Sequence, residues 1–490
     1  MNAAGSVIAA AGLAPLLVAS DIRLRQAGFV AWVIGCAVLA ASLLSNTIAH
    51  LRVTLTGRPL LGLAAVVVGV GALAAGAYVA HRSPALVLWA AVAAAPARIP
   101  FTVGGSSANL LVPLYVVIAC IAAAAAYELA SGRDEPPAAG WIGWTLAAFV
   151  GMSALSMTWT ADPYRGGVSM LFFYLPFAFL AARLSTLHPG RRELTGAVVI
   201  QIALGVLFAV VAFGQELTHH IFWNPNIKVG NLFRSFFRVN SLFWDASVYG
   251  RFMAVTLVLL AGIAIYRRLS PGLAVLMVAL FAAMYFSYSQ SAMVALAAGA
   301  LVLGTGIWPR RLIAGLAGAA AVIAVAGLAA ALRGNSANRV TSDRAHLVRL
   351  GWRVVRHHPI DGAGLGGFQR AAMAGTAHPF HLANAASHTT PVTVIAELGP
   401  LGLALYVALL AAVLLTAARG AAAQGVRVTL AAVFVTIFAS SLFYNSFFED
   451  PATWICMALL ASLAVTAPSH QGIGGRTWPA TTDTPSARSS

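Results

Sequence analysis

Residues 386–402 read ASHTTPVTVIAELGPLG and join two different kinds of sequence. The segment before them, residues 333–390, is polar and rich in histidine and arginine, whereas the residues after them form an apolar run that continues to position 417. Long segments without regular structure are uncommon between packed elements and are usually functional. An apolar run of this length can cross a bilayer as a helix. We therefore expect a long loop to meet a membrane helix at His388 and Glu397.

Most of the chain is as apolar as that run. Of its 490 residues, 60% are hydrophobic and 9% are charged, and the mean hydropathy is +0.84. This composition is too apolar for a water-soluble core and indicates a polytopic membrane protein. The apolar runs are about twenty residues long, which favours membrane helices over the shorter strands of a barrel. We expect an all-α polytopic membrane protein with about 12–15 transmembrane helices.

The polar segments divide the chain into parts. The apolar runs at 5–20 and 84–100 are only marginally long enough to span a bilayer. The predicted organisation is N-terminal transmembrane helices in 1–139, central ones in 140–332 with an external loop at 214–245, the long extracytoplasmic loop with short helices at 333–390, C-terminal transmembrane helices in 391–467, and a disordered cytoplasmic tail at 468–490.

The distribution of arginine predicts which side of the membrane each loop faces. The formal net charge is +16, but the basic residues lie almost entirely in short segments between spans, where they act first as topology signals rather than as nucleic-acid contacts. Alternation places four such segments on one side, which we predict to be cytoplasmic: residues 183–192, 267–268, 310–311 and 419–427. The loops at 214–245 and 333–390 then fall outside, together with the acidic turn Glu449-Asp450. The orientation of the N-terminal helices stays open.

Aromatic and basic residues alternate between Glu216 and Arg251. Such a pattern beside a span is typical of an interfacial anchor, in which rings are buried and cations meet lipid headgroups. The alternative is that Arg234 or Arg238 binds a lipid-linked phosphate, because guanidinium groups pair bidentately with phosphate oxygens. The sequence leaves both interpretations open.

A second basic element lies in the long loop, where residues 342–358 can form a helix. His346, Arg349, Arg353 and Arg356 then share one face, and leucine and valine occupy the other. One interpretation is a basic amphipathic helix on the membrane surface. The other is that this face positions an anionic substrate, and the two are compatible.

His388 is the most specific candidate for chemistry. A histidine near a helix start is often structural, but this one stands at the predicted outer mouth of a span, where two arginine clusters can converge. Glu397 lies inside the predicted span, where a glutamate is costly to bury and marks a functional or strongly paired site. Since nine positions separate the two, we expect no direct contact along a straight helix. The alternative role of Glu397 is to hold a neighbouring helix.

The other polar motifs are weaker candidates for a catalytic or ligand-binding site. The turn at residues 287–291, which includes Ser289, is interpreted first as a way to satisfy backbone groups at a tight membrane turn. The segment 362–367 reads GAGLGG but does not follow a buried strand, so it is a poor nucleotide motif. Neither an HExxH motif nor an Asp-rich external cluster occurs. We therefore expect no metal and no cofactor.

The order of these features resembles the O-antigen ligase and O-antigen polymerase superfamily of bacterial membrane glycosyltransferases. The matching pieces are Ser156 to Pro163, Arg238 to Ala254, the serine-rich turn at 287–291, Arg344 to Gly367, and His388 to Tyr406. The resemblance covers about residues 140–450. It departs from the family where His388-Thr389 replaces His-Asn, Ser289-Gln290 replaces Ser-Arg and Ala246-Ser247 replaces Pro-Asn.

The resemblance implies an activity. Members of that superfamily take a glycan from an undecaprenyl diphosphate carrier and transfer it outside the inner membrane, to lipid A–core or to another glycan, without a metal. By position, His388 would be the catalytic histidine, and Arg238 and Arg344 would bind the diphosphate. We add Arg234 and Arg349 as further candidates for the diphosphate, and Glu397 and Ser289 as supporting residues.

The expected partners are therefore a polyprenyl-diphosphate-linked glycan donor, a glycan or lipid acceptor, and membrane lipids, but no nucleic acid. The chemistry is consistent with this set, because imidazole can take a proton from an acceptor hydroxyl and arginines can stabilise a diphosphate leaving group. The alternative function is a transporter or flippase for a lipid-linked or anionic solute. Arginines near the bilayer midplane around a central cavity would favour that alternative.

Overall fold

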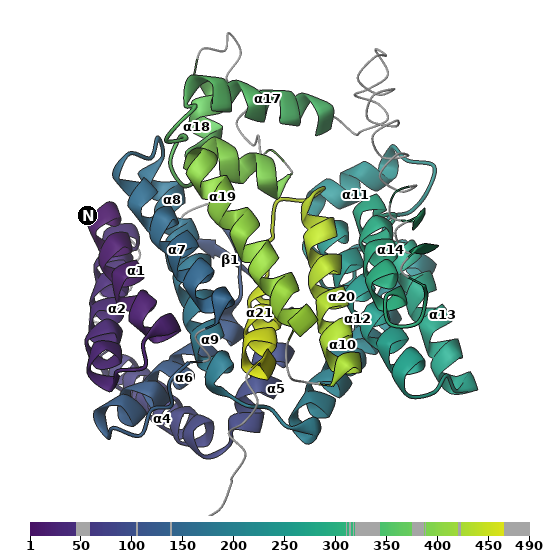
Figure 1. Ribbon diagram of the computed structural model, residues 1–490. Coiled ribbons are helices and arrows are strands. Elements are labelled where there is room, and N and C mark those ends of the chain that lie inside the picture. The colour runs from purple at the N-terminus through teal and green to yellow at the C-terminus, as the bar shows by residue number, and fades with distance from the viewer. Residues whose placement is uncertain are drawn as a thin grey trace, which may run out of the picture.

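A computed structural model describes residues 1–45, 59–103, 106–137, 140–309, 311–312, 315–316, 318, 344–374, 387, 389–419 and 423–464. His388 and the predicted tail at 468–490 lie outside these residues. The described chain forms a helical bundle with one two-stranded hairpin (Figure 1). The predicted all-α membrane class is therefore confirmed, with the hairpin as an unpredicted addition.

The N-terminal part contains α1 (Asn2–Val18), α2 (Ile22–Leu43), α4 (Pro59–Arg82), α5 (Pro84–Ala94), β1 (Ile99–Val103), β2 (Ser106–Leu110) and α6 (Val112–Ala130). Small residues let α1 and α2 pack closely. A Cβ atom on Gly12 would lie 2.3 Å from the backbone nitrogen of Trp32, and one on Gly35 would lie 2.3 Å from the backbone nitrogen of Ala9. Close backbone approach of this kind is how membrane helices associate without a hydrophobic driving force.

The central part contains α7 (Trp141–Leu155), the 3₁₀ turn η1 (Ser156–Thr158), α8 (Pro163–Ser169), the π-helical turn η2 (Met170–Tyr174), α9 (Leu175–Thr186), α10 (Arg191–Thr218), α11 (Pro225–Leu232), α12 (Ala246–Tyr266), α13 (Pro271–Tyr285) and α14 (Gln290–Gly304). The C-terminal part contains α17 (Arg344–His357), α18 (Phe368–Met373), α19 (Thr390–Arg419), α20 (Gln424–Ser441) and α21 (Pro451–Ala464).

Eight of the described helices are long and apolar enough to cross a membrane, and six shorter apolar helices accompany them. The described residues thus contain eight candidate spans, and the predicted count of twelve to fifteen stays a prediction. The span predicted at 84–100 is wrong in detail, because α5 ends at Ala94 and β1 begins at Ile99. Pro96 and Pro100 explain the early end, since proline cannot donate to a continuing helix.

The two ends of the bundle differ. At one end, called here the α17 end, α17 lies across the bundle beside α18, and α11 lies at the same end (Figure 1). The described helices of the predicted loops at 214–245 and 333–390, which are α11, α17 and α18, therefore share an end. At the opposite end, Tyr266 contacts both Gly306 and Gly425. The described arginines next to these residues, Arg267, Arg268 and Arg427, thus lie at this end, and the side of the membrane that it faces stays a prediction.

A buried ionic network holds the opposite end. Asp134 accepts hydrogen bonds from Arg25 and Arg183, and Arg183 also pairs with Glu128. Glu128 in turn lies 2.9 Å from the Nδ1 atom of His81. These contacts join α2, α4, α6 and α9 through the loop that follows α6. Charges buried in this way must be paired, so the network fixes how the N-terminal helices dock.

The chain between α20 and α21, residues 442–450, folds back into the bundle. Phe447 and Phe448 are buried there, and Phe448 stacks on Phe149 of α7 with ring centroids 4.5 Å apart. Trp454 of α21 is fully buried and donates from its indole nitrogen to the Phe448 carbonyl at 3.0 Å. We call residues 442–450 the re-entrant loop. It carries the acidic pair Glu449-Asp450 inward, which places both residues against the central helices.

Candidate active site

The site begins with the glycine loop, defined as residues 362–367. Gly362, Gly364 and Gly366 all have positive φ angles, between 69° and 77°. A Cβ atom on Gly364 would lie 2.2 Å from the Thr160 Cα, so no larger residue fits. Glycine is required because this loop combines left-handed backbone with close approach to another segment.

One side of the glycine loop rests on α19. The Ala363 and Gly364 amides donate to the Ala396 and Glu397 carbonyls, each at 2.8 Å. Those carbonyls are available because Gly399, at φ 66°, interrupts the helix, and Pro400 follows it. The helix break at Gly399, shortly after Glu397, thus holds the glycine loop.

The other side of the glycine loop rests on the segment after α7. The Leu365 amide donates to the Ser156 hydroxyl at 3.1 Å, and the Thr160 hydroxyl donates to the Leu365 carbonyl at 2.7 Å. The Ala161 amide also donates to the Ala363 carbonyl at 2.9 Å. Residues 156–161 therefore serve to clamp a loop that lies about two hundred positions later in the sequence.

A cavity of about 320 Å³ lies beside these contacts, and we call it the glutamate cavity. Its walls come from α8, η2, α18, α19 and the re-entrant loop. They are lined by Tyr164, Arg165, Val168, Ser169, Phe173, Gly366, Phe368, Gln369, Ser387, Thr393, Glu397, Asn445 and Glu449. Glu397 is 8% exposed, and its carboxylate accepts a hydrogen bond from the Phe368 amide at 3.3 Å. This bond ties α18 to α19 at the edge of the cavity.

The re-entrant loop separates this cavity from a buried arginine. Asn445 and Glu449 line the glutamate cavity, whereas Ser446 and Asp450 contact Arg251 on the other side. The loop thus presents polar groups in two directions within six positions. Burial raises the pKa of the Glu449 carboxyl, and the neighbouring Arg98 and Arg251 guanidinium groups lower it in part.

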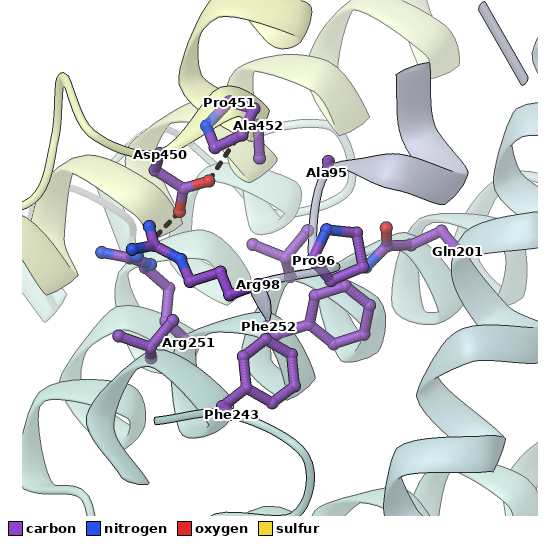
Figure 2. Close-up of a pocket in the computed structure, with 12 residues that line it drawn as sticks. Ala95, Pro96, Arg98, Gln201, Phe243, Arg251, Phe252, Asp450, Pro451 and Ala452 are labelled. Atoms are coloured by element: carbon purple, nitrogen blue, oxygen red, sulfur yellow. Dashed lines mark hydrogen bonds and ion pairs between the residues drawn. The ribbon is translucent and has the colours of Figure 1, made fainter. Parts of the chain in front are cut away.

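Figure 2 shows Arg98 and Arg251 reaching toward Asp450 from two elements. Arg251 is 2% exposed, and its Nη2 atom lies 2.9 Å from Oδ2 of Asp450. Arg98 donates to the Glu449 carbonyl at 3.2 Å. The cavity beside them measures about 50 Å³, which is enough for water but not for a solute.

Neither arginine was among the predicted site residues, although the sequence held a signal for both. Arg98 lies in the apolar run predicted at 84–100, and Arg251 lies in the second turn of α12, which is a predicted span. An arginine within such a run is costly unless it is paired, and it therefore marks a site. The structure identifies the partners that the sequence could not.

Arg238 is held by the serine turn. Its Nε atom donates to the Ser287 carbonyl at 2.8 Å, and its Nη2 atom donates to the Ser247 hydroxyl at 3.2 Å. Its backbone amide donates to the Asn231 side chain at 3.1 Å. These bonds fix the guanidinium at the α17 end, between α11 and α12.

Ser289 has a structural role in this turn. Its hydroxyl accepts from the Ala292 amide at 3.3 Å and so caps α14, and it also contacts the Ser291 hydroxyl at 2.9 Å. This agrees with the interpretation that the serines satisfy backbone groups at a tight turn. Ser289 does not line the glutamate cavity.

The remaining predicted arginines lie toward the surface of the α17 end. Arg234 is exposed, with its guanidinium carbon 5.9 Å from the centre of the Phe236 ring. Arg349 is exposed on α17, whose first residue is Arg344. The side chain of Arg344 lies outside what the structure describes.

The helix predicted at 342–358 is observed as α17, with one correction. Its apolar face, which includes Leu350 and Val354, is buried against Phe368 and Ala396. Protein rather than lipid therefore covers this face. The arginines at 349, 353 and 356 remain exposed, so a basic surface is displayed at the α17 end.

The residues on either side of position 388 are well bonded, although His388 itself lies outside the described residues. Ser387 contacts the Thr393 hydroxyl, and it lines the glutamate cavity. The Thr389 hydroxyl donates to the Leu442 carbonyl at 3.1 Å. The chain that carries the predicted base is thus fastened to the cavity wall on one side and to the re-entrant loop on the other.

Within the part of the chain that the structure describes, no group of three or more His, Cys, Asp or Glu side chains gathers as a metal site. Glu397 and Glu449 are the carboxylates of the glutamate cavity. Their arrangement suits hydrogen bonding to hydroxyl groups and the exclusion of anions.

Comparison with known families gives one assignment. Residues 274–407 match the family model described as O-antigen ligase. The matched region runs from α13 to α19 and includes the serine turn, the glycine loop and Glu397. No curated protein matches the chain.

Proposed function

We propose that the chain is a membrane glycosyltransferase related to the O-antigen ligase family, whose model residues 274–407 match. It would move a saccharide from a polyprenyl-diphosphate carrier to an acceptor hydroxyl. The transfer would take place at the outer face of the inner membrane. The observation that carries the proposal is the glutamate cavity, which holds several polar side chains, is bordered by Gly366 of the glycine loop and is formed in part by residues of the matched domain.

The base assigned to this reaction is His388. Its neighbour Ser387 lines the glutamate cavity, so a side chain at position 388 is close in sequence to the cavity wall. A neutral imidazole near pH 7 can take the proton from an acceptor hydroxyl as the oxygen attacks the anomeric carbon. Direct displacement of this kind inverts the anomeric configuration.

The leaving group is a diphosphate, and arginines would stabilise its growing negative charge without a metal. Arg238 is the first of these, because the serine turn orients its guanidinium at the α17 end. Arg234 lies near it in the sequence and is exposed. Arg344 and Arg349 on α17 are proposed to meet the same carrier from the long loop.

Transport is a weaker alternative. A transporter needs a solute-sized cavity near the middle of the bundle, lined by charged groups. Arg98 and Arg251 do lie inside the bundle, but the cavity that they line measures about 50 Å³. Asp450 also neutralises Arg251, which leaves little charge to attract an anion.

A deletion strain tests the proposed function. It would be complemented with the wild-type protein, with His388→Ala, or with His357→Ala, which changes an exposed histidine of α17. We expect wild type and His357→Ala to restore glycan transfer and His388→Ala to fail while still inserting in the membrane. Full rescue by His388→Ala would refute the assignment of the base.

The same strain distinguishes two forms of the reaction. If polymer accumulates on its lipid carrier and does not reach the acceptor, the protein is a ligase. If only single repeat units remain, the protein is a polymerase. Chain length and attachment can be measured by gel electrophoresis of the cell-envelope glycan.

A further inference from the structure

The wall of the glutamate cavity has a distinctive chemistry. Its polar side chains include the carboxylates of Glu397 and Glu449 and the amides of Gln369 and Asn445. Carboxylates accept hydrogen bonds, and amides both donate and accept them. Such a set can satisfy several hydroxyl groups of one ligand at once.

The same wall is unsuited to a diphosphate. Its two carboxyl groups offer a diphosphate no positive charge, and an ionised carboxylate repels an anion. Arg165 is the one arginine or lysine among the lining residues, and its Nε atom lies 3.7 Å from the Asp162 carboxylate. A neutral ligand rich in hydroxyl groups fits this electrostatic setting better than the carrier does.

Aromatic side chains complete the cavity. Tyr164 is 63% exposed and lines the cavity, while Phe173 of η2 contributes a second ring. Aromatic faces offer apolar contact area, and a tyrosine adds a polar tip. Sugar rings present both C–H faces and hydroxyl edges, so aromatic and acidic groups together match them.

We propose that the glutamate cavity binds the sugar of the acceptor and holds its nucleophilic hydroxyl. This inference rests on the proposed function and names the substrate of one part of that site. The Glu397 carboxylate accepts hydrogen bonds from sugar hydroxyls, and the Asn445 amide both donates to them and accepts from them. Arg238 and the arginines of α17 then serve the donor on the exposed side of the α17 end.

The dimensions of the cavity limit what enters it. Its volume of about 320 Å³ lies at the lower end of the range for small-molecule pockets. It has room for the terminal sugars of an acceptor rather than for a long glycan. The rest of the acceptor would leave past Tyr164 and Arg165, which are exposed.

Steady-state kinetics on the purified full-length protein in liposomes test the inference. Asn445→Ala and Glu397→Gln are the variants, because one removes an amide and the other keeps the shape of the carboxylate without its charge. We expect the KM for the acceptor to rise about tenfold in each, with the KM for the donor within about twofold of wild type.

Gln424→Ala is the matched control, since Gln424 is an exposed amide at the start of α20, at the opposite end of the bundle. It should leave both KM values unchanged. Thermal unfolding of all three variants verifies that they are folded. If the KM for the donor rises instead, the cavity binds the carrier and the inference is wrong. Unchanged KM values in both cavity variants, or a fall in kcat alone, would overturn it as well.

A binding measurement separates this inference from the proposed function. The probe is lipid-free core oligosaccharide released from lipopolysaccharide by mild acid, titrated calorimetrically into the purified protein without donor. Binding that Asn445→Ala weakens about tenfold supports the acceptor site even if no transfer is detected. Absence of binding to wild type, in a protein that does transfer glycan to this core, overturns the acceptor site and leaves the transferase assignment intact.

Discussion

The Arg251 guanidinium and the Asp450 carboxylate lie 2.9 Å apart inside the bundle, and the residue before Asp450 lines the glutamate cavity. This ion pair therefore fastens one face of the re-entrant loop to α12 while the opposite face forms part of the candidate site. The Ser446 hydroxyl, which also contacts Arg251, adds a second attachment. Damage to the ion pair should consequently affect both the stability of the protein and the shape of the cavity.

Arg251→Met tests the contribution of the ion pair. The substitution leaves Asp450 in the bundle without its partner, and removal of one member of a buried pair costs about 3–5 kcal/mol. We expect the free energy of unfolding to fall by that amount, measured by chemical denaturation in detergent. Arg353→Met, at an exposed position of α17, is the control and should change stability by less than about 0.5 kcal/mol.

The double variant Arg251→Met with Asp450→Asn sharpens this test. Since it removes both charges, no uncompensated carboxylate remains, and its loss of stability should be smaller than that of Arg251→Met alone. A loss as large as the sum of the two single variants would mean that Arg251 and Asp450 act independently.

Gly364→Ala tests the seat of the glycine loop. Gly364 has a φ angle of 77°, and a Cβ atom would meet the Thr160 Cα at 2.2 Å. Backbone on both sides must move, so we expect a loss of about 1–3 kcal/mol in the free energy of unfolding together with reduced transfer. Gly151→Ala in α7 is the control, because a Cβ atom there meets nothing within 4 Å. If Gly364→Ala and Gly151→Ala change the free energy of unfolding and transfer to the same extent, the close approach of Gly364 to Thr160 is not important.

Much of the fold follows from patterns that are local in the sequence. Apolar runs predict most of the spans, and the spacing of basic and apolar residues predicts a helix at 342–358 within two residues of its observed ends in α17. Such signals depend on neighbours along the chain, which the sequence displays directly. The hairpin at 99–110 escaped prediction because the apolar run predicted at 84–100 extends into β1 and both strands are only five residues long. The pair Gly104-Gly105 was a turn signal that the prediction did not use.

The candidate site was predictable only in part, because its contacts join distant segments. The sequence identifies Glu397 as a costly residue in a span, but it cannot indicate that Glu397 shares a cavity with Asn445 and Glu449. The clamp between Ser156 and Leu365 likewise depends on tertiary packing. Ser289 was grouped with the site because it lies in a polar turn, whereas its hydroxyl caps α14.

Chelation tests whether the reaction needs a metal. Arginines supply the positive charge in the proposed mechanism, so transfer in the presence of excess EDTA should proceed at the rate found without it. The measurement is initial rate in liposomes made with metal-free buffers. Loss of activity that Mg²⁺ or Mn²⁺ restores would show that a cation joins the diphosphate, and the arginines would then play a secondary part.

Arg238→Lys tests how the donor is recognised. Lysine keeps the charge but has one nitrogen. Arg238 uses separate nitrogens to bond to the Ser287 carbonyl and the Ser247 hydroxyl. Lysine cannot make both bonds and also pair bidentately with phosphate. We expect the KM for the donor to rise about tenfold or more while the KM for the acceptor changes little. Arg268→Lys, at an exposed position after α12 at the opposite end of the bundle, is the matched control. If Arg238→Lys lowers stability and leaves the KM for the donor unchanged, Arg238 only braces the serine turn, and the donor must be bound by other arginines of the α17 end.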